Sequence, residues 1–213
     1  MELKVLDRTG LENLYHQELE QVFADSERRP LRAMLRLQEL GRYEALLALE
    51  DGEPIGYAML WLSERPGSAL LEYLGTLRGK RNGGAGTRIL ALLGERYGEL
   101  FGEAEAPDTG DPEEDSLRQR RIGFYTRNGF RVLDYMCALF GVRFHCLYGG
   151  PETDDRRVQE IHRKVYSSYF SAPHMARYIQ LPLAPGEAVH PAPRWLEEDE
   201  EDDAIQVAII GKP

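Results

Sequence analysis

The spacing of apolar and polar residues predicts alternating strands and helices along the first 150 residues. Apolar runs and period-two alternation predict strands over residues 2–7, 43–50, 54–62, 69–77, 100–106, 130–134 and 135–148. Helical spacing predicts helices over residues 11–24, 30–40, 84–98 and 113–128. This order of elements predicts an α/β fold with a mixed sheet, antiparallel in its first half and connected by helices in its second half.

A break in this pattern divides the chain into two parts. Gly149-Gly150-Pro151 ends the last predicted strand, so we expect a domain over residues 1–150 and an appendage over residues 151–213. Apolar residues at helical spacing predict one more helix over residues 153–170. A tail rich in proline and acid is expected after it, and the β-prone run Ala204 to Ile210 has no predicted partner.

A glycine-rich loop, RNGGAGT from Arg81 to Thr87, lies between a predicted buried strand and a predicted helix. Glycines let the backbone approach an anion closely, and the helix start points free N–H groups at the same place. A phosphate or pyrophosphate is therefore the expected ligand. A Walker loop would need Gly-Lys-Ser/Thr, and a dinucleotide fingerprint would need glycine at Ile89. A glycine turn without a ligand remains the alternative.

Two motifs resemble those of the GNAT superfamily of N-acetyltransferases. The loop from Arg81 to Gly86 resembles the Arg/Gln-x-x-Gly-x-Gly/Ala motif, and the segment from Phe124 to Phe130 resembles Phe/Leu-Tyr-x-x-x-Gly-Phe. The order of elements over residues 1–148 also matches that family. The resemblance implies a GNAT-like, mainly antiparallel sheet and direct acyl transfer from acetyl-CoA to an amine. Asn82, Gly75-Thr76 and Arg118 depart from the residues that are common in the family.

The resemblance also implies roles for particular residues. Acetyl-CoA would contact Gly75, Thr76, Leu77, Arg81, Asn82, Gly83, Gly84, Ala85, Gly86, Thr87 and Tyr125. Tyr125 would protonate the leaving thiolate, because a phenol stays protonated at neutral pH; packing in the core is its alternative role. A backbone N–H near Gly75-Thr76, where the family has a strand bulge, would bind the oxyanion.

The general base is less closely defined by the sequence. Glu72 lies on the buried strand, where an acid is costly unless it is used. Glu105 and Glu103 alternate onto one face of the next strand and are further candidates. Solvent-facing acids and a chain of water molecules are the alternatives.

Other side chains are weaker candidates. Arg120, Arg121 and Arg127 would suit the adenosine phosphates of the cofactor, or they are surface charges on an acidic helix. The aromatic side chains Tyr15, His16 and Tyr43 would line the amine side, or they belong to the core. His145 and Cys146 are adjacent on a strand and should face opposite ways, so no metal site is expected.

Composition narrows the function classes and cellular locations that remain possible. The net charge is −10, but the seven acids from Glu197 to Asp203 supply −7, so the rest of the chain carries −3. This balance gives no sign of the basic surface that binds nucleic acid, and it is compatible with a cationic amine substrate. No apolar run reaches the roughly 20 residues of a membrane span. With only two cysteines and no signal peptide, a cytoplasmic protein is expected.

Two other function classes and one assembly stay open. A domain of the same fold could bind acyl-CoA as a sensor or interaction module without catalysis, although Tyr125 favours the enzyme. A nucleotide-binding protein is disfavoured by the missing lysine and third glycine in the loop. A homodimer is compatible with this fold.

Overall fold

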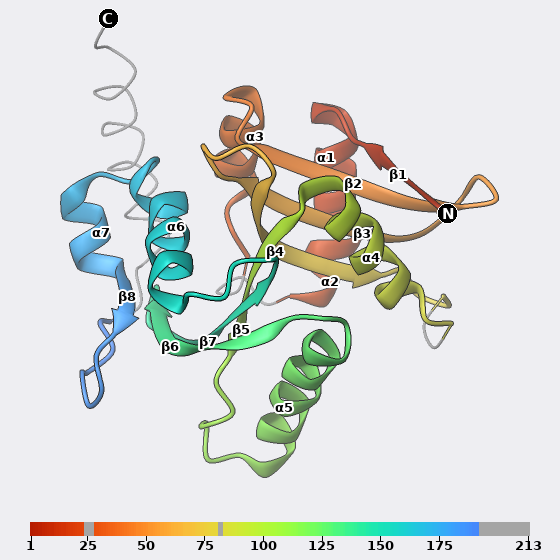
Figure 1. Cartoon of the computed structure of the whole chain (residues 1–213). Helices are drawn as coiled ribbons and strands as arrows, with labels where there is room; N and C mark the ends of the chain where they lie inside the picture. The colour runs from red at the N-terminus through yellow and green to blue at the C-terminus, as the bar shows by residue number, and fades with distance from the viewer. Residues whose placement is uncertain (24–27, 81–82, 192–213) are drawn as a thin grey trace, which may run out of the picture.

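One sheet holds the eight strands found in the described residues, in the order β1-β2-β3-β4-β5-β7-β6-β8 (Figure 1). The structure is a computed structural model that describes residues 1–23, 28–80 and 83–191. The strands are β1 Glu2–Val5, β2 Tyr43–Glu50, β3 Glu53–Leu62, β4 Ser68–Thr76, β5 Glu99–Glu105, β6 Arg131–Leu139, β7 Val142–Gly149 and β8 Ile179–Leu183. Among these eight strands of the described residues, only β4 and β5 pair in parallel, so the predicted mixed, mainly antiparallel sheet is confirmed.

Helices follow the predicted pattern closely. They are α1 Arg8–Leu14, η1 Tyr15–Leu19, α2 Glu20–Val22, α3 Leu31–Glu39, α4 Ala85–Tyr97, α5 Pro112–Arg127, α6 Asp155–Ser167 and α7 Ala172–Tyr178. The predicted helix over 11–24 begins earlier because Asp7 caps it, accepting from the N–H of Gly10 at 2.8 Å. A π-helical turn, η1, lies in its middle. Residue 24, the acidic tail and the run Ala204 to Ile210 lie outside the described residues.

The sheet separates two hydrophobic cores. Along β3, Tyr57, Met59 and Trp61 join one core, and Ala58 and Leu60 join the other, as the period of two requires. The first core lies under α1, α3, α6 and α7, and the second lies under α4 (Figure 1). The sheet is therefore buried on both faces in its centre.

The hairpin between β6 and β7 differs from the prediction. Strands were expected over 130–134 and 135–148, but β6 continues to Leu139 and a turn at Phe140-Gly141 precedes β7. Both turn residues have positive φ, 50° and 88°, which suits a tight hairpin turn. Phe140 is an unusual residue there. Its ring packs against Phe170, His174 and Tyr178, and these contacts offset the backbone cost.

The segment after α6 also differs from the prediction of a tail. Residues 172–183 form α7 and β8, and β8 pairs antiparallel with β6. Figure 1 shows α6, α7 and β8 together at one end of the sheet. Because β8 pairs with β6, the sheet extends beyond the boundary expected at residue 150. Apolar side chains of α6 and α7 also join the first core.

The two parallel strands, β4 and β5, separate before they end. Their pairing runs from Ser68 with Glu99 to Leu71 with Gly102, while each strand continues for several residues. Against β3, the register shifts where Leu60 pairs with Leu71 and Met59 pairs with Tyr73, so Glu72 is the extra residue of a bulge. The bulge expected near Gly75-Thr76 thus lies earlier, at Glu72. Both features open a space in the middle of the sheet.

Close backbone packing beside this opening makes Gly56 sensitive to substitution. A Cβ at Gly56 would lie 2.6 Å from the carbonyl oxygen of Gly75 and 2.7 Å from Cδ1 of Ile89. We expect Gly56→Ala to lower the free energy of unfolding by about 1–3 kcal/mol in urea titrations. Gly94, exposed in α4 with open space around it, is the matched control. Gly94→Ala should raise stability by up to about 1 kcal/mol, and equal effects at both sites would contradict the packing argument.

Candidate functional site

A groove opens between the end of β4 and the start of α4. Gly84 caps α4 with φ of 69°, a left-handed conformation, and the N–H of Arg88 is the first to reach back, to Gly84 O at 3.2 Å. The N–H groups of Ala85, Gly86 and Thr87 therefore have no carbonyl in the preceding turn. The groove has a volume of about 410 Å³ and is lined by Leu74, Gly75, Thr76, Gly84, Ala85, Gly86, Thr87 and Phe124. This end of α4 suits an anion.

The edge of β4 supplies further donors to the opening. Leu77 donates its N–H to Ile55 O at 3.0 Å, on the β3 side. Since successive N–H groups of a strand alternate in direction, those of Thr76 and Leu74 point the other way, where β5 has separated. The strand thus offers polar backbone groups to a ligand that lies between β4 and β5.

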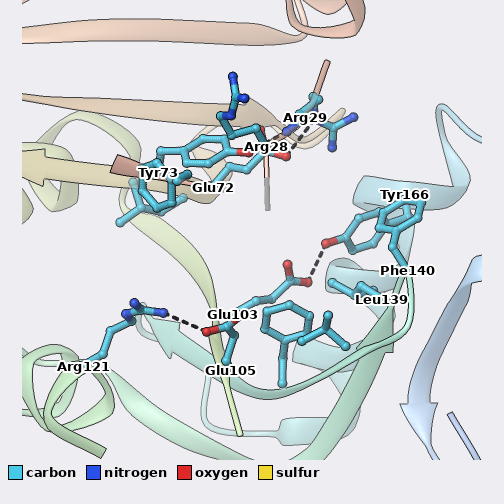
Figure 2. A pocket seen from close by; sticks show the side chains of 14 residues that line it. Arg28, Arg29, Glu72, Tyr73, Glu103, Glu105, Arg121, Leu139, Phe140 and Tyr166 are labelled. Carbon is cyan, nitrogen blue, oxygen red and sulfur yellow. Dashed lines mark hydrogen bonds and ion pairs between the residues drawn. The ribbon is translucent and has the colours of Figure 1, made fainter. Parts of the chain in front are cut away.

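A second cavity lies in the same opening on the side of the first core. It has a volume of about 220 Å³ (Figure 2). Its walls are Phe23, Arg28, Arg29, Leu71, Glu72, Tyr73, Glu103, Glu105, Arg121, Leu139, Phe140, Val142, Phe144 and Tyr166. The three acids that the sequence offered as bases all line it. Glu72 and Glu103 are the first residues on each strand beyond the last β4–β5 pair.

The three acids differ in their partners. Glu72 accepts from Arg29 Nε at 2.7 Å and from the Tyr43 hydroxyl at 2.6 Å, so both of its oxygens are occupied. Burial, followed by the adjacent Glu72 carboxylate, raises the pKa of Tyr43, which keeps it a donor. Glu105 lies 3.2 Å from Arg121, whose side chain is half exposed.

Glu103 belongs to a buried network built partly by α6. Its Oε1 lies 2.8 Å from His162 Nε2 and 2.5 Å from the Tyr166 hydroxyl. The His162 ring is fully buried, and its Nδ1 lies 3.2 Å from the Tyr135 hydroxyl. Burial alone would lower the pKa of His162, but hydrogen bonds to Cys146 and Glu103 raise it to about 9. The network therefore holds Oε1 of Glu103 in place.

The model of the acetyltransferase (GNAT) family matches residues 9–130, which is more than half of the chain. The chain belongs to the GNAT family. This membership supports acyl transfer from coenzyme A. His162 and Tyr166 lie beyond the matched residues.

Solved structures share the GNAT fold. A GNAT-family protein from Bacteroides thetaiotaomicron has a TM-score of 0.63 at 21% identity, covering 78% of this chain and 96% of its own. The GNAT-like decarboxylase GphF, in complex with isobutyryl-CoA, has a TM-score of 0.53 at 14% identity, covering 70% of this chain and 99% of its own. No curated protein sequence matches this GNAT chain significantly.

Most of the loop residues predicted to bind the cofactor of this GNAT domain meet in the groove. Gly75, Thr76, Gly84, Ala85, Gly86 and Thr87 line it, together with Leu74 and Phe124, which the sequence did not single out. Gly83 lies in the loop before Gly84 and is not a wall of the groove. Leu77 packs against the first core instead. Arg81 and Asn82 lie outside the described residues.

Tyr125 lies in α5, a helix that contributes one wall residue to the groove and one to the second cavity. Phe124 lines the groove and Arg121, one turn earlier, lines the second cavity, while Tyr125 itself is a wall of neither. Its half-buried ring packs against Phe124 and Phe130 at 5.4 Å each. No hydrogen bond to its hydroxyl is present among the described residues. Burial raises the pKa of Tyr125 to about 12, although Arg121 lowers it.

The weaker candidates lie elsewhere. Arg120 and Arg127 are exposed, and Arg118 donates to Ala106 O at 2.9 Å. Tyr15 is buried in the first core, and His16 is exposed beside Glu20. Of the three aromatic candidates on the amine side, two reach a cavity residue. Tyr43 donates to Glu72 at 2.6 Å, and the Tyr15 hydroxyl accepts from Arg28 Nη1 at 3.4 Å.

Cys146 and its neighbours do not make a metal centre. Cys146 is fully buried, and hydrogen bonds with Cys137 and His162 lower the pKa of its thiol to about 7, against the effect of burial. Over residues 1–23, 28–80 and 83–191, no group of three His, Cys, Asp or Glu side chains is placed to hold a metal ion. In the same part of the chain, no helix has the length and apolar character to cross a membrane.

Proposed function

We propose that this protein transfers the acetyl group of acetyl-CoA to a primary amine by direct attack. One observation carries the proposal: the groove and the acid-lined cavity open on opposite faces of the same separation between β4 and β5. A thioester entering from the α4 side and an amine entering from the other side would meet there. Holding both reactants in one opening supplies much of the rate enhancement in such a transfer.

The donor half of the site would be built mainly from backbone. The N–H groups of Ala85, Gly86 and Thr87 bind the pyrophosphate of acetyl-CoA, and the edge of β4 holds the pantetheine arm. The N–H groups of Leu74 and Thr76 are the donors nearest to the developing oxyanion. This refines the expected donor near Gly75-Thr76, since the Gly75 N–H points toward β3. Arg81 and Asn82 complete the proposed loop.

The leaving thiolate needs a proton, and Tyr125 is the proposed donor. Its phenol is protonated over the physiological range because burial raises its pKa to about 12. The amine needs to lose a proton, and Glu72 and Glu105 remain proposed as bases. Arg29 and Tyr43 occupy both oxygens of Glu72, whereas the ion pairs of Glu105 with Arg118 and Arg121 in the described residues involve Oε2 alone.

A thiol-release assay with acetyl-CoA and a panel of primary amines tests the function. Amine-dependent release of coenzyme A, with the acetylated amine found by mass spectrometry, is the expected result. Tight binding of acetyl-CoA without turnover of any amine would instead support a non-catalytic sensor. Binding of ATP in preference to coenzyme A would support the nucleotide-binding alternative.

The left-handed backbone of Gly84 gives a direct test of the pyrophosphate site. A side chain at φ of 69° costs roughly 1–2 kcal/mol, so Gly84→Ala should distort the start of α4. We expect the Kd of coenzyme A, measured by calorimetry, to rise about tenfold. Gly83→Ala is the control, because open space surrounds Gly83 and its φ is not in the left-handed region. Equal affinity of the two variants would argue against a backbone anion site at Gly84.

A further inference from the structure

We infer that Glu103, held by His162 and Tyr166 of α6, is the binding site for the ammonium group of a small primary amine with an apolar body. This inference rests on the proposed function, since it names the acceptor of the same site. Glu103 would touch the substrate, and His162 acts through Glu103 as a positioning residue. Tyr166 positions Glu103 and is also part of the cavity wall.

The two oxygens of Glu103 have different surroundings. Oε1 receives both the His162 and the Tyr166 contacts, at 2.8 and 2.5 Å. No hydrogen bond to Oε2 is present in the described part of the chain. Figure 2 shows this second oxygen directed away from Tyr166, toward the side of the cavity where Glu72 lies. The carboxylate is therefore fixed through one oxygen and offers the other to a donor in the cavity.

The residues that fix Glu103 are themselves held rigidly. His162 is fully enclosed, stacks on Phe101 at 5.0 Å and uses both ring nitrogens. Tyr166 is buried and packs edge-on against Trp61 at 5.3 Å. Side chains locked in this way orient a functional group more reliably than mobile ones. His162 does not line the cavity, so a substrate would reach Glu103 without displacing it.

The charges around the cavity single out Glu103 among its acids. Glu72 is paired with Arg29 and Glu105 with Arg121, and these two arginines also line the cavity. A third lining arginine, Arg28, lies 3.6 Å from Glu20. The cation beside Glu103 is His162, which is buried behind the wall and does not line the cavity. A cationic ligand in the cavity therefore finds an arginine beside each of the other acids, and none is paired with Glu103 in the described residues.

The remaining walls indicate the body of the amine. Eight lining residues are apolar or aromatic: Phe23, Leu71, Tyr73, Leu139, Phe140, Val142, Phe144 and Tyr166. A volume of about 220 Å³ is below the range of roughly 300–1,000 Å³ that is usual for drug-sized ligands. Polyamines and aminoglycosides would leave polar groups against these walls unpaired. An arylalkylamine matches both the walls and the acid.

Binding of two isosteric probes tests this inference without catalysis. In the presence of coenzyme A, the affinities of 2-phenylethylamine and 2-phenylethanol are measured by calorimetry. The wild-type protein should bind the ammonium compound at least tenfold more tightly than the alcohol. Glu103→Gln should remove this preference, and Tyr166→Phe should reduce it at least threefold while keeping the packing against Trp61.

Tyr148→Phe is the matched control, because it removes a buried tyrosine–carboxylate hydrogen bond of 2.9 Å, to Glu99, away from the cavity. The control should keep the wild-type preference. Equal binding of the two probes by the wild type, an unchanged preference in Glu103→Gln or Tyr166→Phe, or tighter binding of spermidine than of 2-phenylethylamine would overturn the inference. If Glu103→Gln does not fold, Tyr166→Phe alone decides. Selective binding without thiol release would support this site and refute the proposed enzyme.

Discussion

Replacing Tyr125 with phenylalanine is expected to lower kcat about 10²- to 10³-fold while leaving the KM for acetyl-CoA nearly unchanged. The substitution removes only the hydroxyl and keeps the ring between Phe124 and Phe130. A general acid acts in the transition state, so its loss appears in kcat rather than in ground-state binding. Steady-state kinetics with an amine found in the thiol-release assay measure both parameters.

The pH dependence gives this prediction a second observable. Since burial raises the pKa of Tyr125 to about 12, the phenol is protonated from pH 6 to 10. The ratio of wild-type to variant kcat should therefore be constant across that range. Tyr97→Phe is the control, because this residue of α4 loses a 2.6 Å hydrogen bond to Glu44 of β2 and should keep kcat. A wild-type basic limb near pH 8 that disappears in Tyr125→Phe would contradict the raised pKa.

The parts of this molecule that were predictable from sequence are those fixed by local pattern. The glycine loop lies between a strand and a helix, and both neighbours are visible as apolar runs, so the groove at Gly84 could be located. The strand and helix boundaries from Tyr43 to Arg127 depend on similar short-range signals, including the cap at Asp111. Within this region, each strand or helix begins within one residue of its predicted start.

The acceptor side was less predictable, because it depends on contacts between distant segments. His162 meets Glu103 across 59 positions, and no short-range pattern predicts that contact. The turn at Phe140 carries no Asn-Gly or Asp-Gly signal, and its conformation depends on packing against α6 and α7. The bulge at Glu72 is likewise visible only in the register between β3 and β4. The available signal was the four-residue spacing of His162 and Tyr166, which places both polar groups on one buried face of the helix.

The ion pair between Arg29 and Glu72 should produce the largest effect on stability. Both side chains are mostly buried, with exposed fractions of 11% and 17%. Arg29→Met would leave the Glu72 carboxylate with only the Tyr43 hydroxyl, and breaking a buried pair in this way costs about 3–5 kcal/mol. The guanidinium also lies 4.5 Å above the Trp61 ring, so part of the loss is a cation–π contact. Urea titration of the free energy of unfolding measures the change.

A double variant separates the charge from the packing. In Arg29→Met with Glu72→Gln, no uncompensated carboxylate remains, so the loss should be smaller than in Arg29→Met alone. If the double variant is as unstable as the sum of the two single variants, the pair is not coupled and the argument from burial fails. The same variants bear on the role of Glu72. If Glu72 mainly anchors Arg29 over the cavity, Glu72→Gln should lower the stability of the protein and retain measurable turnover. If Glu72 is the general base, Glu72→Gln should lower kcat with little change in stability.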